Sequence, residues 1–297
     1  MDIYSPNSPS TVAAAIAALR GLDLRTANID EIKKQLGLIS RGWVTTGYTF
    51  HPSPDSLLTR ARICEKLPEH LSEIGAPSPE MVSTFGRANF PGQSIFYASA
   101  GRQMPFFEVA ARTGDKIALS VWEIAKPLTL LPIGYTPEVF EQSSSSREVP
   151  FQLASILSMP YVHRFLSEHF CRVINNRNSH EYKISATFAQ MAYQSTGLHG
   201  VLYPSLAMRA NGDNMALRRD VISNGTIKLR WLEWVEITEC HDMRYSIKTL
   251  LHSERFEHGR IYWDEIQPVS LQPGEKMRIS VKNGRYRFER TDELPRN

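Results

Sequence analysis

Residues 84–111 (TFGRANFPGQSIFYASAGRQMPFFEVAA) restrict the fold more than any other stretch of the chain. Two glycines and a proline within residues 86–92 favour a tight turn with an accessible backbone. Residues 94–98 are aromatic and β-branched, which is typical of a buried strand. Pro105 fits the first turn of a helix, so we expect a helix to begin there. The stretch therefore predicts a turn, a strand and a helix in direct succession.

Three polar side chains occupy successive elements of this stretch. Arg87 lies in the turn, Tyr97 follows ten residues later at the end of the strand, and Glu108 follows eleven residues after that in the first helical turn. A carboxylate between Phe107 and Val109 must be solvated, paired or used in chemistry. Taken alone, Glu108 reads as an exposed acid at a helix start, where acids are common. The combination of the three favours a functional site.

Composition and charge exclude several classes of protein. The 297 residues are 42% hydrophobic and 22% charged, as in ordinary soluble proteins of one large or two small domains. No apolar run approaches the length of a membrane span, and a net charge of +3 is too small to indicate nucleic acid. Three widely spaced cysteines, histidines without ligand spacing and the lack of a basic signal region predict a cytoplasmic protein without a metal site.

Residues 1–50 read as a small helical extension. We expect a first helix capped by Ser10 or Thr11, and a second helix over residues 28–36 that ends at Gly37. The preferred interpretation is a packing accessory to the main domain. An oligomerisation or partner-binding element is the alternative.

The rest of the chain alternates between strand and helix patterns. Helices are expected at residues 151–175 and 183–195, and a polar loop at residues 142–147. Asn211 to Asn214 read as a turn, and Asn283-Gly284 would join a terminal hairpin. The expected strands lie at residues 57–63, 116–123, 128–133, 200–204, 227–240, 244–252 and 259–264.

Two further positions carry candidate site residues. Alternation in residues 57–63 places Arg60 and Arg62 on one strand face, where two arginines can hold an anion; a solvent-facing strand edge explains them about as well. Ser205 follows an apolar strand that ends in Pro204, a location where sheet proteins place site residues. Ser205 has no GxSxG setting, which argues against a hydrolase nucleophile.

Motifs in this order resemble the RES domain over residues 57–240. The residues that carry the resemblance are Arg60 in LTRA, Arg87 in GRANFPG, Tyr97 and Glu108 at the spacing given above, and Ser205 in GVLYPS with Asn214 beyond it. The resemblance implies an α/β (α+β) fold similar to the ADP-ribosyltransferase toxins, a compact mixed β-sheet domain with flanking helices. This catalytic domain would occupy residues 51–297, with strands beyond residue 240 in addition to its core.

The resemblance also implies an activity. Family members destroy NAD by breaking the nicotinamide–ribose bond, as glycohydrolases or phosphorylases, and commonly act as toxins of toxin–antitoxin pairs. NAD would be the substrate, with no cofactor, and an antitoxin protein covering the NAD site would be a partner. The alternatives are ADP-ribosyl transfer to a macromolecule, or a catalytically silent module that binds a nucleotide or a protein. Oligomeric state is left open, with a homo-oligomer among the options.

Each candidate residue has a role under this resemblance. Glu108 would favour positive charge on the ribose, arginines and turn N–H groups would hold the diphosphate, and Tyr97 would stack on nicotinamide. Asn89 is expected to shape the turn, and Ser205 to hydrogen-bond ribose or amide. The candidates are Glu108, Arg87 and Tyr97 as catalytic residues, and Arg60, Arg87, Tyr97 and Ser205 as NAD-binding residues, with Arg62 as the substitute for Arg60.

Overall fold

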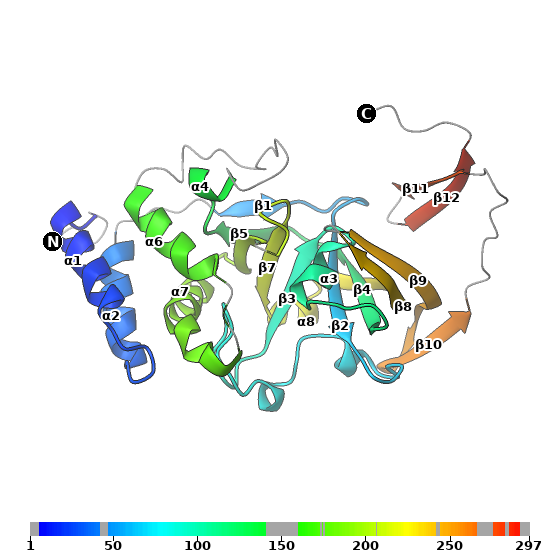
Figure 1. Ribbon diagram of the computed structural model, residues 1–297, viewed down its shortest axis with the longest axis horizontal. Coiled ribbons are helices and arrows are strands. Elements are labelled where there is room, and N and C mark those ends of the chain that lie inside the picture. The colour runs from blue at the N-terminus through cyan, green and yellow to red at the C-terminus, as the bar shows by residue number, and fades with distance from the viewer. Residues whose placement is uncertain are drawn as a thin grey trace. The chain divides into compact units, whose positions relative to one another are not determined.

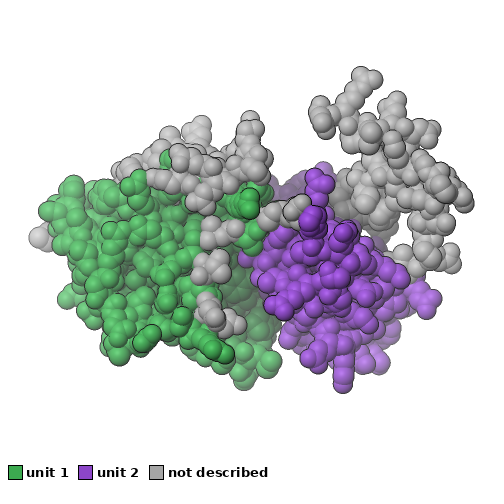
Figure 2. All heavy atoms as spheres, viewed as in Figure 1, with its two compact units in different colours: residues 1–49, 75–100, 128–223 green, residues 50–74, 101–127, 224–297 purple. Residues whose placement is uncertain are grey.

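The computed structural model describes residues 6–41, 47–140, 160–172, 174, 176–205, 207–241, 244–265, 276–282 and 285–291. The chain divides into two units, each built from three separate stretches (Figure 2). Unit 1 comprises residues 1–49, 75–100 and 128–223, and unit 2 comprises residues 50–74, 101–127 and 224–297. The stretch 84–111 is therefore divided between the units. Residues 84–100 belong to unit 1, and residues 101–111 belong to unit 2.

Four helices of unit 1 pack against one another and against its strands (Figure 1). They are α1 (Pro9–Arg20), α2 (Ile29–Ser40), α6 (Pro160–Phe170) and α7 (Lys183–Tyr193). α7 contacts α2, α6 and strand β6, so it lies between the N-terminal helices and the sheet. One hydrophobic cluster includes Leu36, Phe165 and Phe188 from the helices and Val201 and Tyr203 from the sheet.

The N-terminal helices form where the sequence predicts them, with two differences. Ser8 caps α1 in place of Ser10 or Thr11, because Pro9 takes the first helical position and the Ser8 hydroxyl accepts from the Thr11 N–H at 3.2 Å. α2 does not end at Gly37 but continues to Ser40. Its last turn buries Ile39 completely, so tertiary packing outweighs the low helix propensity of glycine.

We predict that Gly37→Ala stabilises the protein by about 1 kcal/mol, because alanine removes the backbone entropy penalty of a glycine inside a helix. A Cβ at this position meets no heavy atom within 4 Å. Urea-induced unfolding of both proteins measures the difference. A lower unfolding free energy for the variant would contradict the prediction.

The strands of unit 1 follow the order β1-β5-β6-β7-β3. They are β1 (Tyr48–Phe50, whose last residue is assigned to unit 2), β5 (Leu128–Pro132), β6 (Gly200–Pro204), β7 (Asp213–Arg218) and β3 (Ile95–Ala100). β5 and β6 run parallel, whereas β6–β7 and β7–β3 are antiparallel. β7 begins at Asp213 and Asn214, which the sequence places in a turn; both side chains are buried and hydrogen-bonded, so they form strand despite their polarity.

The strands of unit 2 follow the order β2-β4-β8-β9-β10, and every pair is antiparallel. They are β2 (Leu57–Ile63), β4 (Lys116–Ile124), β8 (Ile227–His241), β9 (Arg244–Glu257) and β10 (Arg260–Glu265), close to the predicted ranges. Helix α3 (Met104–Glu108) packs against β2. The predicted terminal hairpin is confirmed, since β11 (Lys276–Lys282) pairs with β12 (Arg285–Thr291).

Short helices complete the described structure. They are α4 (Pro137–Phe140), α8 (Asp220–Ser223), and the 3-10 turns η1 (Leu71–Glu73), η2 (Pro79–Met81) and η3 (Asn176–Tyr182). The predicted fold class, mixed α/β, is confirmed. The predicted loop at residues 142–147 and the first part of the helix predicted at residues 151–175 lie outside the described residues, and the division at residue 50 stays a prediction. Among the described helices, none combines the length and the apolar character that crossing a bilayer requires.

Helix α6 buries two histidines in unit 1. His163 is 3% exposed and His169 is 9% exposed. Burial lowers the pKa of both imidazoles to about 4, and for His169 the charges of Arg172 and Arg20 act in the same direction. Both side chains are therefore neutral at pH 7.

We predict that the protein loses stability as the pH falls from about 6.5 towards 4. Histidines of the unfolded chain take up protons near pH 6.5, whereas the folded ones do so at about pH 4, so the unfolded state binds more protons between these values. Urea unfolding at pH 7 and at pH 4.5 measures the loss. The double variant His163→Gln, His169→Gln should lose less over this range, and an equal loss would contradict the prediction.

Candidate functional site

The turn at residues 86–92 is fixed by the hydroxyl of Tyr97. The backbone N–H of Ala88 donates to this oxygen at 3.0 Å, and the hydroxyl donates to Oδ1 of Asn89 at 2.8 Å. The Asn89 amide also donates to the carbonyls of Thr84 and Phe90. Asn89 therefore shapes the turn, as predicted.

Helix α7 holds the same turn from a second direction. The hydroxyl of Tyr193 donates to the carbonyl of Ala88 at 3.1 Å. The side chain of Gln93 accepts from the Phe90 N–H at 3.0 Å and contacts the side-chain amide of Gln190. The turn is therefore bonded on both sides by side chains from β3 and α7.

The guanidinium of Arg87 contacts two tyrosine rings. Its Cζ is 5.2 Å from the ring centre of Tyr203 on β6 and 5.8 Å from that of Tyr182 at the end of η3. Nη2 donates to the carbonyl of Arg172 at 3.0 Å. These contacts restrict a long, flexible side chain to one orientation. Unit 1 thus presents a half-buried cation whose direction is set before any ligand binds.

Tyr97 lies in the middle of β3 rather than at its end, because the strand continues to Ala100. Burial raises the pKa of its hydroxyl, and the neighbouring Tyr203 adds to this effect while Arg87 opposes it. The phenol is therefore neutral at pH 7. It acts as a hydrogen-bonding and packing group and not as a base.

Ser205 follows β6, two residues after Tyr203, and is fully buried. Its hydroxyl accepts from the N–H of Met208 at 3.3 Å, and its backbone bonds to Gly212 and Ala210. These bonds shape the turn that leads to β7. The role of Ser205 in binding NAD stays a prediction.

Tyr182 was not identified from the sequence, and Asn214 was named there as part of the RES resemblance without a role in the site. The register of β7 places Asn214 opposite Ser99 on one side and Tyr203 on the other. Ser99 donates to its Oδ1 at 2.7 Å. Nδ2 of Asn214 is buried and has no hydrogen-bond partner among the described residues. The sequence indicated Asn214 because it follows the motif that ends in Ser205. No sequence pattern near Tyr182 indicated its contact with Arg87.

Arg60 and Arg62 both belong to β2 of unit 2 and are half-buried. The guanidinium of Arg62 donates to the carbonyl of Glu73 in η1. The backbone carbonyl of Arg60 accepts from Ser120 on β4 at 3.2 Å. The assignment of Arg60 to an anion, with Arg62 as its substitute, stays a prediction.

Glu108 is the last residue of α3 and not part of its first turn, which corrects the expectation from the sequence. The helix begins at Met104 and ends after five residues, because Ala110 adopts a left-handed φ of 49°. The Glu108 side chain is exposed. A carboxylate at a helix C-terminus gains nothing from the helix dipole, so helix stabilisation does not explain it.

The apolar side of α3 is firmly anchored within unit 2. Phe106 is fully buried, and Tyr245 on β9 contacts the rings of Phe106 and Phe107 at centroid distances of 5.7 and 4.7 Å. Burial raises the pKa of Tyr245 to about 12, so its hydroxyl stays protonated and donates to the carbonyl of Ala111 at 3.1 Å. The backbone that carries Glu108 is therefore held in place.

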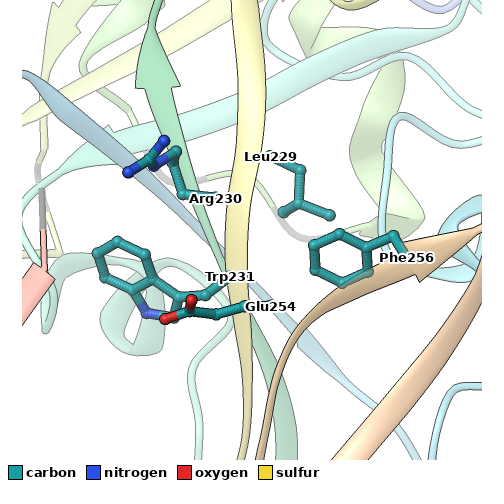
Figure 3. A pocket seen from close by; sticks show the side chains of 5 residues that line it. All are labelled: Leu229, Arg230, Trp231, Glu254 and Phe256. Carbon is teal, nitrogen blue, oxygen red and sulfur yellow. The ribbon is translucent and has the colours of Figure 1, made fainter.

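A small pocket lies on β8 and β9 (Figure 3). Its volume is about 270 Å³, and it is lined by Leu229, Arg230, Trp231, Glu254 and Phe256. Leu229 faces Phe256, and Arg230 pairs with Glu123 at 3.3 Å. The pocket is below the usual size of small-molecule sites and contains none of the predicted site residues.

A model of the RES domain matches residues 58–231. The chain belongs to the RES domain family. The match includes Arg60, Arg87, Tyr97, Glu108 and Ser205, and it ends within β8. No curated protein and no solved structure matches the chain. The resemblance noted from the motifs is thereby confirmed, while the roles of the individual site residues stay predictions.

We predict that Gly86→Ala destabilises this RES domain protein by about 1–3 kcal/mol, as overpacking does. A Cβ at residue 86 would collide with Oδ1 of Asn89 and lie 3.1 Å from the Tyr97 hydroxyl, so the bond between these side chains must give way. Thermal and urea unfolding measure the effect. Gly21→Ala is the control, since its Cβ would meet only ordinary contacts at 3.6 Å. Equal stability of the two variants would contradict the prediction.

Proposed function

We propose that this protein cleaves the nicotinamide–ribose bond of NAD, with water or phosphate as the acceptor. The observation that carries the proposal is the guanidinium of Arg87, in contact with two tyrosine rings within the RES domain match. A fixed guanidinium suits a diphosphate, because its planar donors match phosphate oxygens.

The bond that breaks joins C1′ of the ribose to the pyridinium nitrogen of nicotinamide. Its electron pair moves to the nitrogen, which neutralises the ring, and positive charge develops on the ribose. Water that attacks C1′ and loses a proton gives ADP-ribose, whereas phosphate gives a phosphorylated ADP-ribose. A carboxylate near the developing charge stabilises the transition state more than the ground state.

We assign that carboxylate to Glu108, which α3 presents to solvent from an anchored backbone. Arg87 binds the diphosphate, with Arg60 as the second arginine. Neutral Tyr97 supplies an aromatic face for nicotinamide, and Ser205 a hydrogen bond to ribose or amide. These roles follow the family pattern residue by residue.

A protein with this activity drains the NAD of the cell that makes it. We therefore propose that it is the toxin of a toxin–antitoxin pair, with an antitoxin that covers the NAD site. The same chemistry with a macromolecular acceptor would be ADP-ribosyl transfer, and a protein that kept only the binding step would be a silent nucleotide-binding module.

We predict that Glu108→Gln lowers kcat for NAD cleavage by about 10²–10³-fold, because the neutral amide cannot stabilise positive charge on the ribose. Product analysis of purified protein in buffers with and without phosphate distinguishes the acceptors. ADP-ribose in both buffers indicates hydrolysis, and a phosphorylated product only with phosphate indicates phosphorolysis.

The matched control is Glu257→Gln, since Glu257 is an exposed carboxylate on β9 of the same unit. It should turn over NAD like the wild type. Full turnover by Glu108→Gln would refute the assigned role. No loss of NAD with folded wild-type protein would refute the proposed activity and favour the transferase or the silent module.

A further inference from the structure

Two residues near η3, Arg172 and Tyr182, contact Arg87 in unit 1. The carbonyl of Arg172 accepts from Nη2 of Arg87 at 3.0 Å. The guanidinium of Arg172 pairs with the carboxylate of Glu181, the residue directly before Tyr182. Arg172 and Tyr182 therefore both contact Arg87, and an ion pair joins Arg172 to the neighbour of Tyr182.

The two rings that contact Arg87 are held in different ways. Tyr203 is 2% exposed, belongs to β6 and packs at 6.1 Å from the ring of Phe170 in the hydrophobic cluster. Tyr182 is only half-buried and belongs to η3, whose helical path is interrupted at Asn178 (φ −109°, ψ 26°). The sheet and the core fix the ring of Tyr203, whereas Tyr182 lies where η3 meets α7, and the Ser185 hydroxyl donates to its backbone carbonyl at 3.1 Å.

This difference matters for the orientation of Arg87. A guanidinium in contact with a single ring can still rotate about its long side chain, while a second ring on another element restricts that rotation. The carbonyl of Arg172 sets the direction of Nη2 in addition. Of the two tyrosine rings that contact Arg87, that of Tyr182 is therefore the less buried.

We propose that Tyr182 is a positioning residue for anion binding: its ring holds the Arg87 guanidinium in the orientation that binds a diphosphate. The proposal rests on the proposed function for the identity of the substrate, NAD. Its physical content, an anion site whose affinity depends on the ring of Tyr182, is independent of the cleavage step. Tyr182 acts through Arg87 and requires no contact with the reacting atoms.

The test is binding of inorganic pyrophosphate, measured by isothermal titration calorimetry on the full chain, together with KM and kcat for NAD. Tyr182→Ala should weaken pyrophosphate binding about 3- to 30-fold, the range that a cation–π contact implies. KM for NAD should rise by a similar factor while kcat changes less than about twofold. Tyr182→Phe keeps the ring and should restore binding.

Two controls separate positioning from general loosening of the fold. Tyr161→Ala removes a tyrosine from α6 of the same unit, 40% exposed, and should leave pyrophosphate binding unchanged. Arg87→Ala should abolish binding. A Tyr182→Phe variant as weak as Tyr182→Ala would mean that the hydroxyl or the fold is responsible, which would overturn the proposal.

The remaining outcomes are equally decisive. Unchanged binding in Tyr182→Ala, or wild-type binding that survives Arg87→Ala, would also overturn the proposal, and so would wild type that binds no pyrophosphate. Binding that depends on Arg87 and Tyr182 without any NAD cleavage would support Tyr182 as a positioning residue. That same result would refute the proposed enzymatic activity, so the two failures are distinguishable.

Discussion

The hydroxyl of Tyr97 joins strand β3 to the glycine turn, and the geometry around Arg87 depends on this link. The hydroxyl accepts from the N–H of Ala88 and donates to Asn89 at the same time. Only a neutral phenol can do both, because a phenolate has no proton to donate. Burial keeps the proton in place by raising the pKa. The turn therefore depends on a tyrosine that remains un-ionised.

The core and the candidate site of unit 1 share residues instead of lying in separate layers. Tyr203 is part of the hydrophobic cluster that includes the helices, and its ring also faces the guanidinium of Arg87. Tyr193 belongs to the same cluster, and its hydroxyl reaches the carbonyl of Ala88. Packing of the helices against the sheet thereby sets the positions of polar atoms in the turn. Substitutions in the core can therefore shift these polar atoms without replacing a residue of the candidate site.

Local patterns in the sequence were enough to predict most strands, the N-terminal helices and membership of the RES domain family. Some errors arose where distant contacts decide the outcome, and others where the local backbone does. Gly37 did not end α2, because Ile39 is buried one half-turn later. Glu108 fell at the end of its helix, because the chain turns at Ala110. The contact between Arg87 and Tyr182 joins residues that are far apart in the chain, and no local pattern announces such a pair.

The family match and the folded structure end at different residues. The match stops at residue 231, whereas Tyr245, whose ring covers Phe106 and Phe107, lies on β9 beyond it. A chain cut at residue 231 would keep Glu108 and lose the side chain that covers its helix. In this protein, a strand outside the matched residues, β9, contributes a side chain that packs on helix α3. Helix α3 and Glu108 therefore depend for part of their packing on a strand that the family match does not include.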